Sequence, residues 1–192
     1  MKVVAFNGSA RPAGNTAQAI GMVFDELKKE GIETELVNIG LKRLSGCTAC
    51  YKCRDNKDKK CALAGDDMNT YIQKMIEADG IIIGSPVYYG SMTTNTKALM
   101  ERSGQVARFN DMLFKRKVGT PVVAVRRAGS NFTYAAINFF FGILEMPIAT
   151  SSYWNVTLAR EQGEIMKDEE GIRTFKNLGQ NMAWMIKRLS QK

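Results

Sequence analysis

All four cysteines of this 192-residue chain lie in one short segment, GCTACYKCRDNKDKKC, as Cys47, Cys50, Cys53 and Cys61. Thiolates in such a cluster can bind an iron–sulfur cluster or a zinc ion, pair as disulfides, or stay free. Structural zinc sites commonly use two separated cysteine pairs, and disulfide frameworks are typical of small secreted proteins. Residues 52–60 contain five basic and two acidic side chains, and this positive excess lowers thiol pKa values and favours metal loading.

A second group of polar residues follows the first apolar segment of the chain, in GSARPAGNT (residues 8–16). This segment matches neither the dinucleotide pattern G-x-G-x-x-G nor the P-loop pattern, because no lysine follows Gly14. Hydroxyl, amide and guanidinium groups before a helix suit a terminal phosphate, although a tight turn capped by Asn15 or Thr16 is the alternative. The candidate ligands are Ser9, Arg11, Gly14, Asn15 and Thr16.

A third group follows another apolar segment, in SPVYYGSM (residues 85–92). Pro86 stiffens the start of this loop, Gly90 allows a ligand to approach the backbone, and the two tyrosines offer flat apolar faces. A phosphate on one loop and a planar ring on the other match flavin mononucleotide (FMN); the alternative is a pair of ordinary, partly buried aromatic side chains. The candidate residues are Pro86, Val87, Tyr88, Tyr89, Gly90 and Ser91.

The elements that must position these groups alternate between short apolar strands and amphipathic helices. Strands are predicted at residues 2–7, 33–39, 80–85, 118–125 and 149–156, and helices at 16–30, from Asp66 or Asp67 onward, at 93–103, at 132–144 and after Asp168. Near-continuous apolar strands that alternate with helices predict a parallel sheet with helices on both faces. We therefore expect a flavodoxin-like, doubly wound α/β fold with strand order 2-1-3-4-5, and a cysteine loop (residues 46–62) after the second strand.

The composition indicates one soluble globular domain over residues 1–192, with 45% hydrophobic and 24% charged residues. The N-terminus does not resemble a secretory signal and no window has the apolar length of a transmembrane helix, so we expect a cytoplasmic protein with reduced thiols. The net charge of +8 allows a non-catalytic basic binding module, but nucleic-acid motifs and long basic runs are absent from the sequence. We expect neither a nucleic-acid partner nor a membrane partner.

The two loops together resemble the NAD(P)H-dependent FMN reductase branch of the flavodoxin-like flavoproteins. The matching motifs are S-x-R-x-x-G-N-T (residues 9–16) and G-S-P-V-Y-Y-G-S (residues 84–91). Lys97 and Arg102 also resemble the family, whereas Glu101 occupies a position where the family often has Asp. The resemblance covers the whole chain in the order of its elements, and it implies an FMN cofactor.

The cysteine spacing C-x2-C-x2-C-x7-C is similar to the compact motif of the iron–sulfur flavoproteins within that branch. The resemblance implies a [4Fe–4S] cluster on Cys47, Cys50, Cys53 and Cys61, close to the flavin of a dimer partner. Three cysteines spaced three residues apart can converge on one face of a cubane, and a more distant fourth can close the site. The last spacing is longer than in the family motif, and no proline follows Cys61.

We therefore predict an FMN-dependent oxidoreductase or electron-transfer flavoprotein with a [4Fe–4S] cluster; a cluster-free NAD(P)H-dependent FMN or quinone reductase is the alternative. No catalytic side chain is predicted, because the flavin carries the redox chemistry. Gly129, with Arg126 and Arg127, forms a third loop that can reach the flavin or a nucleotide phosphate, or can be a solvated turn. Expected electron partners are ferredoxin, NAD(P)H as a reductant, quinone or oxygen species. A homodimer or homotetramer is expected, with residues 139–141 as a candidate interface.

Overall fold

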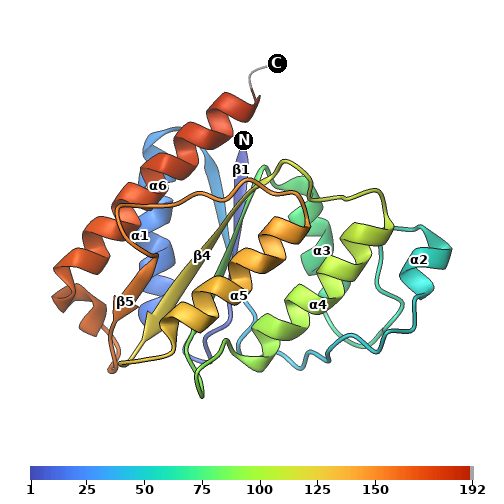
Figure 1. The fold of residues 1–192 in the computed structure, drawn as a ribbon, viewed down its shortest axis with the longest axis horizontal. Helices are drawn as coiled ribbons and strands as arrows, with labels where there is room; N and C mark the ends of the chain where they lie inside the picture. The colour runs from blue at the N-terminus through green and yellow to red at the C-terminus, as the bar shows by residue number, and fades with distance from the viewer. Residues whose placement is uncertain (191–192) are drawn as a thin grey trace.

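The computed structural model describes residues 1–190 (Figure 1), so the last two residues of the predicted domain lie outside the described part. The strands are β1 (Lys2–Asn7), β2 (Glu33–Asn38), β3 (Gly80–Pro86), β4 (Val118–Val125) and β5 (Val156–Leu158). The helices are α1 (Asn15–Lys29), α2 (Lys52–Asn56), α3 (Met68–Glu77), α4 (Thr94–Phe109), α5 (Ser130–Ile143), the 3-10 helix η1 (Glu164–Lys167) and α6 (Glu169–Ser190).

The five strands form one parallel sheet in the order β2-β1-β3-β4-β5, which confirms the predicted topology. The chain winds outward from β1 in both directions, and Phe6 of β1 is aligned with Val37 of β2 and Ile83 of β3. All parallel strands present their carboxyl ends at the same edge, where ligands of doubly wound sheets bind.

Side chains alternate between the two faces of the sheet, and each face has its own hydrophobic core. Val3 and Ala5 point into a core under α1 and α6, whereas Val4 and Phe6 point into a core under α3, α4 and α5. Figure 1 shows α1 and α6 on one side of the sheet and α5 on the other. Helices therefore cover both faces, as predicted.

Two predicted element boundaries are wrong. The fifth strand was expected at 149–156, but β5 begins at Val156; Tyr153 and Trp154, which have high strand propensity, are half exposed in an irregular segment. The buried Asn155 amide instead donates to Thr120 Oγ1 (3.0 Å) and to the carbonyl of Pro121 (3.1 Å). The helix expected at 93–103 continues to Phe109, because Val106 and Ala107 extend its buried face.

The segment after β2 leaves the carboxyl edge of the sheet and runs back along α4, as Figure 1 shows, with α2 packed beside that helix. The Asn95 amide at the start of α4 fixes this path by donating to the carbonyls of Ile39 (2.7 Å) and Lys42 (2.8 Å). Across residues 1–190, every helix is too short or too polar to cross a membrane.

Candidate functional site

A cavity opens at the carboxyl edge of the sheet, between the β1–α1 and β3–α4 loops and the ends of β4 and β5. It is lined by Ser9, Arg11, Gly14, Asn15, Thr16, Pro86, Val87, Tyr88, Ala124, Arg126, Ala159 and Arg160. Eight of these residues are among the predicted cofactor ligands: the five of the β1–α1 loop and the first three of the β3–α4 loop.

The β1–α1 loop is a compact turn that ends at the N-terminus of α1. The Gly14 amide donates to the Arg11 carbonyl (2.9 Å), and the Arg11 amide donates to Ser9 Oγ (3.1 Å). A Cβ at Gly14 would lie 2.9 Å from the Arg11 Cβ, so this turn leaves no room for a side chain there. Thr16 is 1% exposed in the first turn of α1, next to backbone amides that have no partner within the helix. Such amides attract anions.

Asn15 has a structural role that its sequence context does not reveal. Its Nδ2 donates to the Glu161 carbonyl (2.8 Å), and its Oδ1 accepts from the Gly163 amide (2.9 Å). Arg11 also reaches this segment, donating to the Arg160 carbonyl (3.4 Å). The residues after β5 therefore form an additional wall of the cavity, held against the β1–α1 loop.

The β3–α4 loop contains a tight two-residue turn. Tyr88 and Ser91 exchange two backbone hydrogen bonds (2.8 and 3.1 Å), while Tyr89 and Gly90 have φ values of 50° and 79°. Positive φ at both central positions defines a type I′ turn. Tyr88 lines the cavity, whereas the Tyr89 ring is fully exposed at the tip, so only one of the two tyrosines contacts the cavity.

Gly129 is the N-cap residue of α5 and lies in the left-handed region, with φ of 92°. A Cβ there would lie 2.9 Å from both Gly90 Cα and Val87 Cγ1. Gly129 therefore supports the β3–α4 loop from behind rather than lining the cavity. Tyr89, Gly90, Ser91 and Gly129 all lie at the predicted edge but outside the cavity wall.

The cavity is cationic. Arg11, Arg126 and Arg160 line it, and its lining in residues 1–190 contains no carboxylate. Arginine forks match the geometry of phosphate oxygens. Together with the α1 N-terminus, these side chains fit a group with a terminal phosphate.

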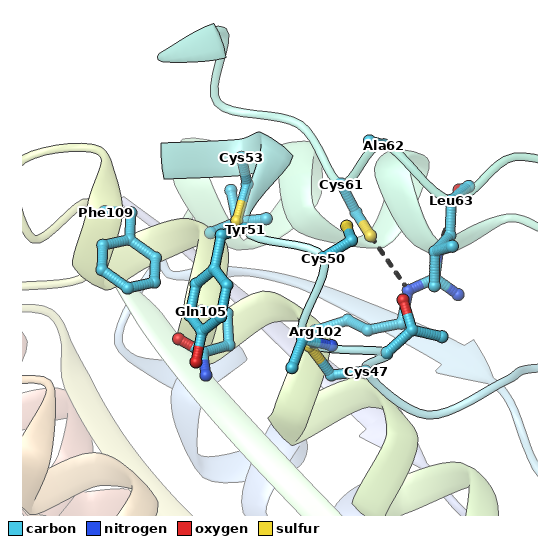
Figure 2. A pocket seen from close by; sticks show the side chains of 13 residues that line it. Cys47, Cys50, Tyr51, Cys53, Cys61, Ala62, Leu63, Arg102, Gln105 and Phe109 are labelled. Atoms are coloured by element: carbon cyan, nitrogen blue, oxygen red, sulfur yellow. Dashed lines mark hydrogen bonds between the residues drawn. The ribbon is translucent and has the colours of Figure 1, made fainter. Parts of the chain in front are cut away.

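A second cavity lies between the cysteine loop and the C-terminal half of α4, and all four cysteines line it (Figure 2). Cys53 comes from α2 and is buried, Cys47 and Cys61 are half buried, and Cys50 is exposed. Within residues 1–190, no two of these cysteines form a disulfide. Leu63, Val106 and Phe109 are among the apolar residues around them.

The thiols differ in their electrostatic surroundings. A hydrogen bond from the Lys52 backbone lowers the pKa of Cys50, which favours its thiolate. Burial raises the pKa of Cys53, and the neighbouring Cys61 and Cys47 raise it further. Like charges therefore accumulate at this cavity when the thiols ionise, and a cationic metal centre would relieve that repulsion.

Two consecutive residues of α4 hold the ends of the cysteine loop. Glu101 accepts a hydrogen bond from the Cys47 amide (3.2 Å). The Arg102 side chain is fully buried; its Nε donates to Cys61 Sγ (3.2 Å), drawn as a dashed line in Figure 2, and its other nitrogens bond the loop and Asp66.

The four thiols supply the number and kind of donors that a cubane takes. Each iron of a [4Fe–4S] cluster takes one thiolate, so the four sulfurs surround the cluster, whereas ligands of a single ion meet at one point. Within the described residues, no three His, Cys, Asp or Glu side chains are close enough to hold a single ion. Four thiols around one partly apolar cavity are the donor set that a [4Fe–4S] cluster requires.

The two cavities are separate. In the described part of the chain they share no lining residue, and α4 separates them along its length. Arg102 to Phe109 lie eight to fifteen residues beyond Thr94, which at 1.5 Å per residue is about 12 to 22 Å along α4 from its start at the carboxyl edge of the sheet.

Comparison with known proteins decides the family. Residues 1–161 match the family described as NADPH-dependent FMN reductase. An iron–sulfur flavoprotein of Methanocaldococcus jannaschii is 35% identical over 100% of both chains, and one of Archaeoglobus fulgidus is 31% identical over 95% of this chain and 94% of its own. The chain belongs to the iron–sulfur flavoproteins of the NADPH-dependent FMN reductase family.

This family member is an FMN-dependent oxidoreductase of the electron-transfer class. Its fold is also that of a flavodoxin, WrbA-like protein from Agrobacterium tumefaciens, with a TM-score of 0.68, 14% identity and coverage of 97% of both chains. The family assignment agrees with the resemblance seen in the cysteine motif and the two loops.

Two arginines that line the cavities are missing from the predicted site residues, although Arg102 is among the residues that resemble the family. Arg160 reaches the cavity from a segment far along the chain, and no local pattern marks it. Arg102 could have been found, because it lies three residues after Leu99 and four before Val106, on the buried stripe of α4. A charge on a buried helical face indicates a specific partner.

Proposed function

We propose that this flavoprotein holds FMN in the cavity at the carboxyl edge and a [4Fe–4S] cluster in the cysteine cavity, and passes electrons between an external carrier and the flavin. The observation that carries the proposal is that all four cysteines line one cavity, although Cys61 lies fourteen positions after Cys47. A loop built only for surface contact would have no need to gather its thiols.

For FMN, the first-turn amides of α1 with Ser9, Arg11 and Thr16 would bind the phosphate, and residues 86–88 would flank the ring. FMN supplies one- and two-electron chemistry, so the protein contributes binding, orientation and charge. Arg11, Arg126 and Arg160 would neutralise the phosphate.

The FMN site is tested with the double variant Arg11→Ala, Thr16→Ala. Each lost hydrogen bond to a charged phosphate costs about 1–3 kcal/mol, so the dissociation constant should rise at least tenfold. Asp25→Ala, at an exposed position further along α1, is the matched control. Protein that stays colourless after loading with excess FMN and desalting would refute the site.

For the cluster, Cys47, Cys50, Cys53 and Cys61 would each ligate one iron, and the cluster would supply one-electron transfer. The basic residues around the loop leave a positive surface beside an anionic centre, which suits docking of an acidic electron carrier such as a ferredoxin. We infer that electrons enter through this surface.

The decisive experiment is anaerobic purification of the wild type, which should give about four iron and four sulfide per chain. Cys50→Ala should lose the iron and keep FMN, because the two cavities are separate. Cys61→Ala tests whether the cysteine after the long spacing is the fourth ligand. Lys60→Gln, at the exposed neighbouring position, is the matched control. Wild type without iron or sulfide after reconstitution would overturn the cluster assignment.

The second candidate is an NAD(P)H-dependent FMN or quinone reductase with free thiols, which the match to the NADPH-dependent FMN reductase family favours. Rapid steady-state oxidation of NADPH with a quinone acceptor would support this candidate. Efficient uptake of electrons from reduced ferredoxin, with poor use of NADPH, would support the iron–sulfur version.

We also propose a symmetric homodimer or homotetramer in which the cluster of one chain lies beside the FMN of another. The separation of the two cavities within one chain supports this arrangement. Of the predicted interface, Phe140 and Phe141 are buried in the core, while Phe139 is 74% exposed and Tyr89 is fully exposed near the flavin edge.

Mixed dimers test this arrangement. A chain with Cys50→Ala is combined with a chain that carries the double FMN-site variant. In this hybrid, the only complete pair of cofactors is the cluster of one chain and the FMN of the other. Rapid cluster-to-flavin electron transfer in this hybrid is expected; none would contradict the arrangement, and so would light scattering that shows only a 21.4 kDa monomer.

A further inference from the structure

Arg102 is the largest side chain that is fully buried in the described part of the chain. Charged side chains are almost never fully buried unless their charge is paired. Burial opposes the charge of the guanidinium, but bonds to Asp66 and Cys61 outweigh this effect and raise the pKa of Arg102 above its ordinary value. The side chain therefore stays a permanent cation beside the cysteine cavity.

Arg102 bridges the two arms of the cysteine loop. One Nη donates to the Ser45 carbonyl (3.4 Å), two residues before the first cysteine, and to the carboxylate of Asp66. The other Nη donates to the Leu63 carbonyl (2.9 Å), and Nε donates to Cys61 Sγ (3.2 Å). Removal of this side chain would release the start and the end of the loop together.

The bond to Cys61 differs in kind from the others. The backbone carbonyls and Asp66 fix the guanidinium in place, and this fixed guanidinium then aims one N–H at a sulfur that lines the cavity. Figure 2 shows Arg102 beneath Cys61, with Cys50 alongside. In residues 1–190, Arg102 is the one arginine that lines this cavity.

Hydrogen bonds to ligating sulfurs are a main means by which proteins set cluster potentials. Reduction adds negative charge to a cluster, and a donor or a cation beside its sulfur stabilises that charge. The guanidinium cannot lose its proton at any ordinary pH, so its effect persists in both redox states.

We propose that Arg102 is a positioning residue that holds Cys61 as the fourth cluster ligand across the seven-residue gap and favours the reduced cluster through its N–H···S bond. This inference rests on the proposed cluster. In this arrangement α4, through Arg102, fixes where Cys61 lies after the seven-residue gap.

The test uses Arg102→Gln and Arg102→Lys, with the exposed Arg108→Gln on the same helix as the matched control. Loss of such a supporting contact typically lowers metal affinity 10- to 100-fold. A chelator should therefore remove iron from both Arg102 variants before it removes iron from the wild type or from Arg108→Gln. A tenfold weaker preference for the reduced cluster makes the one-electron potential 59 mV more negative. FMN content should match the wild type.

Asp66→Asn separates positioning from simple stabilisation. This change breaks the ion pair but leaves the N–H···S bond, and it removes a negative charge, so the potential should stay or become more positive while thermal stability falls. Equal loss of thermal stability in Arg102→Gln and Asp66→Asn, with unchanged potential and iron retention, would overturn the inference.

If the Arg102 variants do not fold, a measurement on the wild-type protein can test the inference instead. In protein labelled with 15N-arginine, electron–nuclear double resonance of the reduced cluster should detect hyperfine coupling to a guanidinium nitrogen, and absence of coupling would overturn the inference. Wild type that binds no iron would refute the proposed cluster itself. A loaded wild type with unaffected variants would refute only the role of Arg102.

Discussion

Replacement of Asn15 separates two contributions to the flavin cavity, namely its construction and its charge. Asn15→Ala removes both hydrogen bonds to the segment after β5, those to Glu161 (2.8 Å) and Gly163 (2.9 Å). A typical bond contributes about 0.5–1.5 kcal/mol, so the apoprotein should lose about 1–3 kcal/mol of unfolding free energy. Asn15→Asp keeps the acceptor for Gly163 but turns a carboxylate oxygen toward the Glu161 carbonyl, so it should lose at least as much.

The two variants should differ clearly in their affinity for FMN. An aspartate at this position puts a negative charge in the phosphate cavity, and two unit charges about 5 Å apart repel by about 3 kcal/mol at an effective dielectric constant of about 20. Asn15→Asp should therefore raise the dissociation constant roughly 100-fold, and Asn15→Ala by less.

Urea unfolding of the apoproteins and fluorescence titration with FMN measure the two quantities. Riboflavin is the internal control, since it lacks the phosphate and should bind the Asp variant with little extra penalty. Wild-type FMN affinity in Asn15→Asp would refute a phosphate at this cavity. Unchanged stability of Asn15→Ala would refute the structural role of the side chain.

Three further changes test the scaffold. Gly129→Ala should cost at least about 1–2 kcal/mol, because φ is 92° there; Gly142→Ala, with open space around it in α5, should instead stabilise by about 0.5–1 kcal/mol in the same denaturation assay. Burial opposes the charge of Asp168, but amides of Gly171 and Leu158 outweigh it and keep its pKa below the ordinary 3.8. That stabilisation is present above about pH 4 and is lost as the pH falls through the folded-state pKa, so Asp168→Asn should flatten the acid limb of a stability–pH profile; an unaltered limb would contradict this.

The centre of the sheet could be predicted because β1, β3 and β4 are almost entirely buried, apolar segments. β3 and β4 are continuous apolar segments that are buried along almost their whole length. Such a pattern predicts a central strand of a parallel sheet. β5 could not be located in the same way, because it has three residues and its neighbours Tyr153 and Trp154 have the composition of a strand without the burial.

The residues of the candidate site also differ in how far the sequence could identify them. The β1–α1 and β3–α4 loops are contiguous motifs, so their residues could be named together from sequence. Asn15 and Arg102 could be named only as local features, because their partners depend on packing between distant segments. Sequence patterns report the element on which a side chain lies, whereas its bonding partner is a property of the tertiary fold.

The wall that Glu161 and Gly163 add to the flavin cavity has a consequence for biosynthesis. A ribosome releases the chain from its N-terminus, and the residues that line the cysteine cavity all lie between positions 47 and 109. The flavin cavity needs Arg160, so it cannot close until about fifty more residues have emerged. During translation the residues that line the cysteine cavity have thus all emerged while Arg160 has not, so the proposed flavin cavity is the later of the two to have its full set of lining residues.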